Sequence, residues 1–335
     1  MLTRRALLGT TIAAGAIGAF AVRTARSEDF KLRWGHSMPA THSLTRRGQE
    51  AVDKIRAETQ GRVDIQIFPD NQLGGDNDMT AQVRAGALEI YTAAATSVAP
   101  LVPIAGIINT AFAFKDSAQA YQALDADLGK LVIAGFAKVN LHAFDKFWTN
   151  GFRQITTATK PINSPADLVG FKIRVPTSPM LLSLFRALGA TPTSMNVSEL
   201  YSALQTRIVD GQENPLSIIA TRNFHEVQKY CSTTNHVWDI FTQTANMKAW
   251  TAIPPDLQEI VSRNLNEAAL KQRADVDYEN SVLQKTLEGK GLVFNVPEGA
   301  PFREALRKAG YYAQWQKTYG EQPWKTLEKY AGVLA

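Results

Sequence analysis

Three side chains within residues 148–215 could bind an anion together. They are Arg153, Arg174 and Asn214. A guanidinium held on a strand presents a rigid fork of N–H donors that matches both oxygens of a carboxylate. The pattern therefore indicates a carboxylate site. The residues also leave open a structural ion pair of Arg174 with a nearby acid, for which the candidates are Asp167, Glu199 and Asp210.

The local sequence predicts how these side chains are positioned. Residues 171–175 form an apolar, β-branched segment that carries Arg174 and stops at a proline. Thr177 then precedes a Ser-Pro step and a helical pattern, and Asn214 precedes a proline and a second helical pattern. Each of these two side chains could hydrogen-bond a ligand or cap its helix. Two helix N-termini beside two arginines strengthen the prediction of a carboxylate site.

Several ordered sequence blocks resemble the solute-binding subunits of tripartite ATP-independent periplasmic (TRAP) transporters, of the dicarboxylate type. The blocks are residues 68–69, 72–75, 150–154, 172–176, 211–215 and 226–230. The resemblance covers nearly the whole chain after its N-terminal segment. It implies an α/β, two-lobed periplasmic binding protein fold, in which crossing strands and a long spine helix join two α/β domains. It also implies a protein that is no enzyme and needs no cofactor. Such a protein captures an organic acid anion by lobe closure and delivers it to the small and large TRAP membrane subunits.

The resemblance assigns roles to Arg174 and Arg153, and the expected positions of Trp148, His36 and Asp76 in the fold suggest roles for these three residues. In that family the arginine of the Ile-Arg-Val-Pro block, which is Arg174 here, grips the ligand carboxylate. Arg153 would be a second cation, with a hinge salt bridge as the alternative. Trp148 lies at the expected lobe crossing and would form an apolar wall, with a place in the core as the alternative. His36 and Asp76 lie in loops after expected strands and would contact the distal end of the ligand, with loop capping as the alternative.

The residues after the third expected strand bear on ligand identity. Sialic-acid-binding members of the resembled family carry a Glu and an Arg there, whereas residues 93–97 here are Ala-Ala-Ala-Thr-Ser. This small, uncharged stretch disfavours a sialic acid ligand. Four-carbon dicarboxylates, uronates, keto or hydroxy acids and aromatic acids all remain open, and so does the oligomeric state.

Residues 1–27 are typical of an export signal. Arg4 and Arg5 precede an uncharged run over residues 6–22, and residues 25–27 offer small side chains at the two positions that a signal peptidase reads. The paired arginines favour the twin-arginine route over a Sec signal. A membrane anchor is disfavoured because the run is shorter than the roughly 20 apolar residues that a span requires. We therefore expect a periplasmic mature protein without stable membrane insertion.

Composition narrows the possible partners. Residues 1–27 hold four arginines and no acid, so removing them lowers the formal net charge from +5 to +1. The mature chain then offers no charge-based case for nucleic acid. The single cysteine, Cys231, excludes an internal disulfide and is typical of a small core residue. The five histidines are scattered without metal-ligand spacing, so we expect no metal site.

Strand and helix signals divide the chain into two lobes. Residues 29–112 read as βαβαβ, which predicts a parallel sheet whose ligands bind beyond the carboxyl ends of the strands. Residues 256–288 contain no proline or glycine, which predicts a long inter-lobe helix over about 255–288. We expect lobe I to comprise residues 28–150 and 240–279, and lobe II to comprise residues 151–239 and 280–335.

Two other classes of protein compete with this interpretation. A secreted enzyme is disfavoured by the lack of a Gly-x-Ser-x-Gly elbow, a phosphate-binding loop and a His-Glu-x-x-His motif. A binding protein of an ABC importer or of a sensor kinase would suit the same lobes. The sequence blocks named above favour the TRAP system over both.

Overall fold

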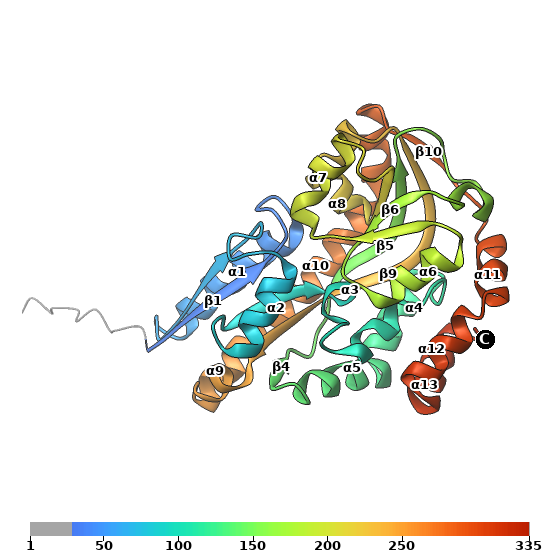
Figure 1. Cartoon of the computed structure of the whole chain (residues 1–335). Helices are drawn as coiled ribbons and strands as arrows, with labels where there is room; N and C mark the ends of the chain where they lie inside the picture. Colours follow the sequence, from blue (N-terminus) through green and yellow to red (C-terminus); the bar gives the residue numbers. More distant parts are fainter. Residues whose placement is uncertain (1–28, 335) are drawn as a thin grey trace, which may run out of the picture.

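The computed structural model describes residues 29–334, which form a two-lobed α/β molecule built on one ten-stranded sheet (Figure 1). Eight strands follow one another in the order β2-β1-β3-β9-β5-β8-β6-β7, and β4 and β10 each pair with β9. The expected export signal lies outside the described residues. The predicted α/β class is confirmed.

The first lobe follows the strand–helix alternation expected from the sequence. Its elements are β1 (Phe30–His36), α1 (Ser43–Glu58), β2 (Val63–Phe68), α2 (Asp76–Ala85) and β3 (Ile90–Ala94). β1 lies between β2 and β3 and is parallel to both. Gly86 ends α2 with a φ of +78°, a left-handed conformation that glycine adopts without steric cost.

The second lobe repeats this arrangement with shorter strands. Its elements are β6 (Lys172–Val175), α6 (Pro179–Ala187), β7 (Thr191–Ser194), α7 (Val197–Gln205), β8 (Gly211–Asn214) and α8 (Leu216–Thr221). β6 is parallel to both β7 and β8. The carboxyl ends of these strands therefore meet at one edge, and α6, α7 and α8 begin there.

Two long antiparallel strands join the lobes. They are β5 (Trp148–Thr157) and β9 (Tyr230–Asn246), and β9 also pairs with β3 while β5 pairs with β8. The pairing of β5 with β9 shifts register between Thr149 and Gly151 and again between Arg153 and Ile155. The expected lobe boundaries at residues 150/151 and 239/240 fall inside these two strands and stay predictions.

The long helix α10 (Pro255–Gly289) packs against both lobes. It contacts α1 in the first lobe, α8 in the second and the crossing strand β5 (Figure 1). Gln272 of α10 fixes it to β5, because its side-chain amide accepts a hydrogen bond from the Thr149 N–H and donates one to the Thr149 carbonyl, both at 2.8 Å.

The remaining elements are helices that lie around the sheet and two short strands, β4 and β10, that belong to it. They are α3 (Ala95–Val98), η1 (Pro103–Asn109), α4 (Ser117–Leu124), α5 (Asp127–Ala137), β4 (Leu141–Ala143), η2 (Pro165–Leu168), η3 (Phe224–Glu226), α9 (Met247–Thr251), β10 (Val293–Asn295), α11 (Gly299–Lys308), α12 (Tyr311–Tyr319) and α13 (Glu321–Ala331). The single helix expected over 117–138 is two helices. It breaks at Asp125, whose carboxylate binds Arg273 of α10 and Lys146.

Hydrophobic residues form one core cluster on each face of the sheet. Successive residues of a strand point to opposite faces, and on β3 Ile90 joins one cluster while Tyr91 joins the other. The same alternation positions Arg174, because Ile173 and Val175 both point into the cluster on one face. The guanidinium therefore projects from the opposite face.

Candidate functional site

A small cavity of about 20 Å³ lies where the two lobes meet. The first lobe lines it with Ser37 and Asp76, the second with Arg174 and Asn214, and the crossing strand β5 with Asn150 and Arg153. Four residues singled out in the sequence, Arg153, Arg174, Asn214 and Asp76, therefore lie at one site. That site is at the carboxyl ends of the parallel strands, as expected for this sheet topology.

Arg174 is buried in this cavity without an acidic partner. Its side chain is 2% exposed, and its Nε and Nη2 atoms both donate to the Met195 carbonyl, at 3.0 and 2.7 Å. A guanidinium has five N–H donors, so three have no partner within residues 29–334. Burial lowers the pKa of Arg174 to about 10, with Glu213 opposing and Arg153 adding to this shift. The side chain therefore stays protonated at neutral pH and can accept a bidentate carboxylate.

The acids considered as structural partners of Arg174 bind other groups. Asp167 accepts hydrogen bonds from Ser164 and forms an ion pair with Lys160. Asp210 accepts from the backbone N–H of Lys172, and Glu199 accepts from Asn196. The structural ion pair left open by the sequence is thus not formed, and the Arg174 donors remain for a ligand.

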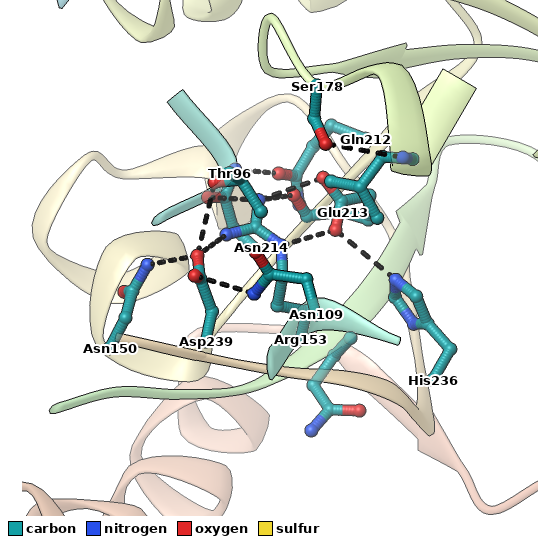
Figure 2. Close-up of polar contacts among 12 residues, drawn as sticks. Thr96, Asn109, Asn150, Arg153, Ser178, Gln212, Glu213, Asn214, His236 and Asp239 are labelled. Atoms are coloured by element: carbon teal, nitrogen blue, oxygen red, sulfur yellow. Dashed lines mark hydrogen bonds and ion pairs between the residues drawn. The ribbon is translucent and has the colours of Figure 1, made fainter. Parts of the chain in front are cut away.

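Arg153 forms the hinge salt bridge that was its alternative role (Figure 2). Its Nε and Nη2 bind the Glu213 carboxylate, and its Nη1 binds the Asp239 carboxylate at 3.0 Å. Nη2 also donates to the Glu213 carbonyl and to the Asn214 Oδ1 atom, at 2.8 and 3.1 Å. One Nη1 hydrogen has no partner among the residues described here, so a ligand contact stays a prediction.

The sequence did not single out the two carboxylates that hold Arg153. Asp239 also accepts hydrogen bonds from Thr96, Asn109 and Asn150, at 2.8–3.2 Å (Figure 2). These donors come from α3, η1 and β5, so Asp239 joins the first lobe to both crossing strands. The only sequence signal for this role was an aspartate within an otherwise apolar, extended segment.

Glu213 is the second buried anion of this cluster. Burial alone would raise its pKa, but the charge of Arg153 and the hydrogen bonds from His236 and Arg153 outweigh burial, and the pKa of Glu213 falls below its ordinary value. His236 approaches the carboxylate through Nε2, at 3.2 Å (Figure 2). Glu213 thus remains ionised and fixes the position of Arg153.

The helix-capping alternatives for Thr177 and Asn214 are wrong. Ser178 caps α6, with its hydroxyl accepting from the Leu181 N–H, and Pro179 is the first helical residue. α8 begins one residue after Pro215, so Asn214 does not cap it, and its amide instead contacts Gln212 and Arg153. Thr177 does not line the cavity and accepts a hydrogen bond from Ser194 at 3.4 Å. Its ligand role stays a prediction.

Trp148 and His36 are also absent from the cavity lining. Trp148 is fully buried, packs edge-on against Trp34 and donates to Gln243 at 3.0 Å, which corresponds to its alternative role in the core. His36 is buried beside Trp34, and its Nδ1 accepts from the Met38 N–H. Phe241 and other apolar side chains line the cavity instead. The ligand roles of Trp148 and His36 remain untested predictions.

Asp76 faces the cavity from the first lobe as the first residue of α2. Its Oδ1 accepts from the Tyr91 hydroxyl and its Oδ2 from the Ser97 hydroxyl, each at 3.1 Å. Both neighbours are neutral, and no lysine or arginine of residues 29–334 lies within ion-pair distance. Asp76 therefore contributes a negative charge that forms no ion pair within residues 29–334, and this charge opposes the lowering of the Arg174 pKa.

The lobes touch beside the cavity at two points. Arg222, just after α8, donates to the Ser37 carbonyl and forms an ion pair with Asp70 at 3.0 Å. Gly75 packs so closely on Asn196 that a Cβ atom there would lie 2.8 Å from the asparagine side chain. These contacts hold the first and second lobes together over the site.

Two negative observations concern residues 29–334. No group of three or more His, Cys, Asp or Glu side chains is arranged to hold a metal ion there. Within the same residues, no helix has both the length and the apolar character needed to cross a membrane.

Known proteins resemble this chain over most of its length. Residues 34–318 match the family described as bacterial extracellular solute-binding protein, family 7. The 2,3-diketo-L-gulonate-binding periplasmic protein YiaO of Escherichia coli K12 is 30% identical over 283 residues, which are 84% of this chain and 85% of YiaO.

Solved structures show the same relationship. A TRAP periplasmic solute-binding protein from Roseobacter denitrificans, with bound β-D-glucuronate, is 28% identical with a TM-score of 0.85, over 90% of this chain and 99% of that one. Another from Sulfurospirillum deleyianum, with bound succinate, is 27% identical with a TM-score of 0.84, over 91% and 99% of the two chains. This chain therefore belongs to family 7 of the bacterial extracellular solute-binding proteins, the DctP family, and is a TRAP-type solute-binding protein.

Proposed function

We propose that this protein captures an organic acid anion between its lobes through Arg174 and delivers it to the membrane subunits of a TRAP transporter. One observation carries the proposal: Arg174 is buried and protonated in the inter-lobe cavity, and no acidic side chain of residues 29–334 pairs with it. Burying an ion costs several kcal/mol unless a partner compensates for the lost hydration. A ligand carboxylate supplies that partner through two parallel N–H···O bonds.

Two neighbouring side chains could bind the same ligand carboxylate. Arg153 and Asn214 each retain one N–H donor after their internal hydrogen bonds are counted, and both line the cavity beside Arg174. They would hold the carboxylate oxygen that faces β5 and β8. Charge-assisted hydrogen bonds contribute roughly 1.5–3 kcal/mol each, so the set suffices for specific binding.

The ligands of the relatives support the chemical class. YiaO is named for 2,3-diketo-L-gulonate, and the structures cited above hold β-D-glucuronate and succinate. Each of these molecules is an organic acid anion at neutral pH. Their sizes and polar groups differ, so they favour a carboxylate site without fixing the rest of the ligand.

We place the mature protein in the periplasm, after export directed by residues 1–27, and we assign the closed form as the form that docks on the small and large TRAP membrane subunits. The ligand favours docking if it binds the closed state more tightly than the open state. The Arg222–Asp70 ion pair and the Gly75–Asn196 contact form only when the lobes meet. No catalytic step is needed.

A thermal-shift screen of organic acids against the mature protein tests the proposal. An acid that binds the native state raises the melting temperature by mass action, and isothermal titration calorimetry then gives its affinity. We expect at least one carboxylate ligand, whose binding is lost in Arg174→Ala. Stabilisation by neutral sugars alone, or ligand binding that survives in Arg174→Ala, contradicts the proposal.

Delivery is tested with small and large TRAP membrane subunits from the same organism, reconstituted in proteoliposomes. Uptake of the identified acid should require this protein, and Arg174→Ala should abolish it. Uptake that proceeds equally without the protein would rule out the delivery role while leaving the binding result intact.

A further inference from the structure

The cavity presents one available cation and one available anion, on opposite lobes. Arg174 from β6 supplies the cation, since its charge has no acidic partner in the described chain. Asp76 from α2 supplies the anion, since its two carboxylate oxygens contact only the hydroxyls of Tyr91 and Ser97. Arg153, the remaining charged residue of the lining, is already bound by Glu213 and Asp239.

The positions of Arg174 and Asp76 determine which groups the far end of a ligand contacts. With its carboxylate on Arg174, the ligand extends toward the first lobe, where Asp76, Ser37 and Ser97 line the cavity. Each oxygen of an ionised carboxylate can accept two hydrogen bonds, so both Asp76 oxygens retain an acceptor position. A ligand hydroxyl can donate to that position. A second ligand carboxylate would meet the charge of Asp76, which forms no ion pair within residues 29–334, and like charges repel strongly at a buried site.

We propose that the ligand is a hydroxylated monocarboxylate, and that Asp76 is the residue that selects it over dicarboxylates of the same length. The inference rests on the proposed function, because it takes the contact between Arg174 and a carboxylate as given. Asp76 acts twice: it accepts a hydrogen bond from a ligand hydroxyl, and it repels a second carboxylate.

A matched pair of four-carbon acids tests the selection. D-Erythronate and meso-tartrate share their hydroxyls at C2 and C3 and differ at C4, which is a hydroxymethyl group in one and a carboxylate in the other. Calorimetric titration of the mature protein should show D-erythronate binding at least tenfold more tightly. D-Gluconate and D-glucarate make the same comparison for a six-carbon ligand.

Asp76→Asn isolates the charge, because the amide has nearly the same size and still accepts from one of the two hydroxyls. We expect the preference for the monocarboxylate to fall to within about threefold, mainly through tighter binding of the dicarboxylate. Asp78→Asn is the matched control: it removes one negative charge from the same helix turn, but Asp78 is exposed and does not line the cavity. It should keep the wild-type preference.

Several outcomes would overturn the inference. A wild type that prefers the dicarboxylate, or a preference that is unchanged in Asp76→Asn, removes the role of Asp76. Tighter binding of 4-amino-3-hydroxybutanoate than of D-erythronate would assign Asp76 to a ligand ammonium group instead. Such results leave the proposed function standing if binding still requires Arg174. If none of these acids binds but another carboxylate from the screen does, this inference fails and the proposed function stands. If binding survives in Arg174→Ala, the proposed function and this inference both fail.

Discussion

Arg153 and Arg174 line the same cavity and are equally buried, at 2% exposure, but their surroundings are opposite. Arg153 binds two buried carboxylates, a carbonyl and an amide oxygen, so nearly all its donors have internal partners. Arg174 binds a single backbone carbonyl. Burial of a guanidinium therefore does not by itself identify a ligand site. The donors that remain after the internal partners within residues 29–334 have been counted are what distinguishes Arg174 from Arg153.

Removing Arg153 should give the largest effect, on stability. Arg153→Met leaves Glu213 and Asp239 buried without their counter-ion, and breaking a buried pair in this way costs about 3–5 kcal/mol of unfolding free energy. Urea unfolding measures the loss. The triple variant Arg153→Met/Glu213→Gln/Asp239→Asn should recover most of it, because no uncompensated charge remains. A loss below about 1 kcal/mol in the single variant would show that the pairs contribute little.

Removing Arg174 should act on binding and leave the fold intact. We expect Arg174→Ala to weaken the acid identified by the screen at least about a hundredfold, which is roughly 2.7 kcal/mol. Its unfolding free energy should change by less than about 1 kcal/mol, because no ion pair is broken. Calorimetry and urea unfolding on the same samples separate the two effects. Arg174→Lys keeps the charge without the fork and should give an intermediate affinity.

A third arginine, Arg222, extends the comparison to the contact between the lobes. Its partner Asp70 is about half exposed, and exposed ion pairs contribute at most about 1 kcal/mol. Arg222→Gln should therefore weaken ligand binding only about threefold, by destabilising the closed arrangement. Asp70→Asn should give a similar loss, and the double variant should lose little more than either single variant. Additive losses in calorimetry would show that the two residues act separately.

The pH dependence of binding should be the smallest effect. A carboxylate ligand binds protonated Arg174 more tightly than neutral Arg174. The affinity is therefore highest well below the Arg174 pKa of about 10 and declines as the pH rises through that value. We expect no change between pH 6 and 8 and a loss of about twofold at pH 10. Burial lowers the pKa values of His36 and His42 to about 3, so neither titrates in this window. A marked fall in calorimetric affinity between pH 6 and 8 would point to another titrating group.

The separation of interacting residues along the chain decided which of these features could be predicted from the sequence. Arg174 could be placed because its strand, the proline after it and the following helix lie within a few residues of one another. The partners of Arg153 could not, since Glu213 and Asp239 are 60 and 86 residues away and meet it only through the pairing of β5 with β8 and β9. The capping roles predicted for Thr177 and Asn214 were wrong because each helix cap lies one residue later in the chain, which is the usual uncertainty of a helix end.

The paired hydrogen bonds from Gln272 to Thr149 have a consequence for how the molecule opens. They occupy both the N–H and the carbonyl of one residue, so α10 cannot slide along β5 without losing both bonds at once. Sliding is thereby disfavoured, and rotation about this fixed point remains. Gly151, two residues on with a φ of +98°, can absorb such a rotation because it lacks a side chain. We therefore expect α10 and β5 to rotate together about the contact between Gln272 and Thr149 when the lobes open.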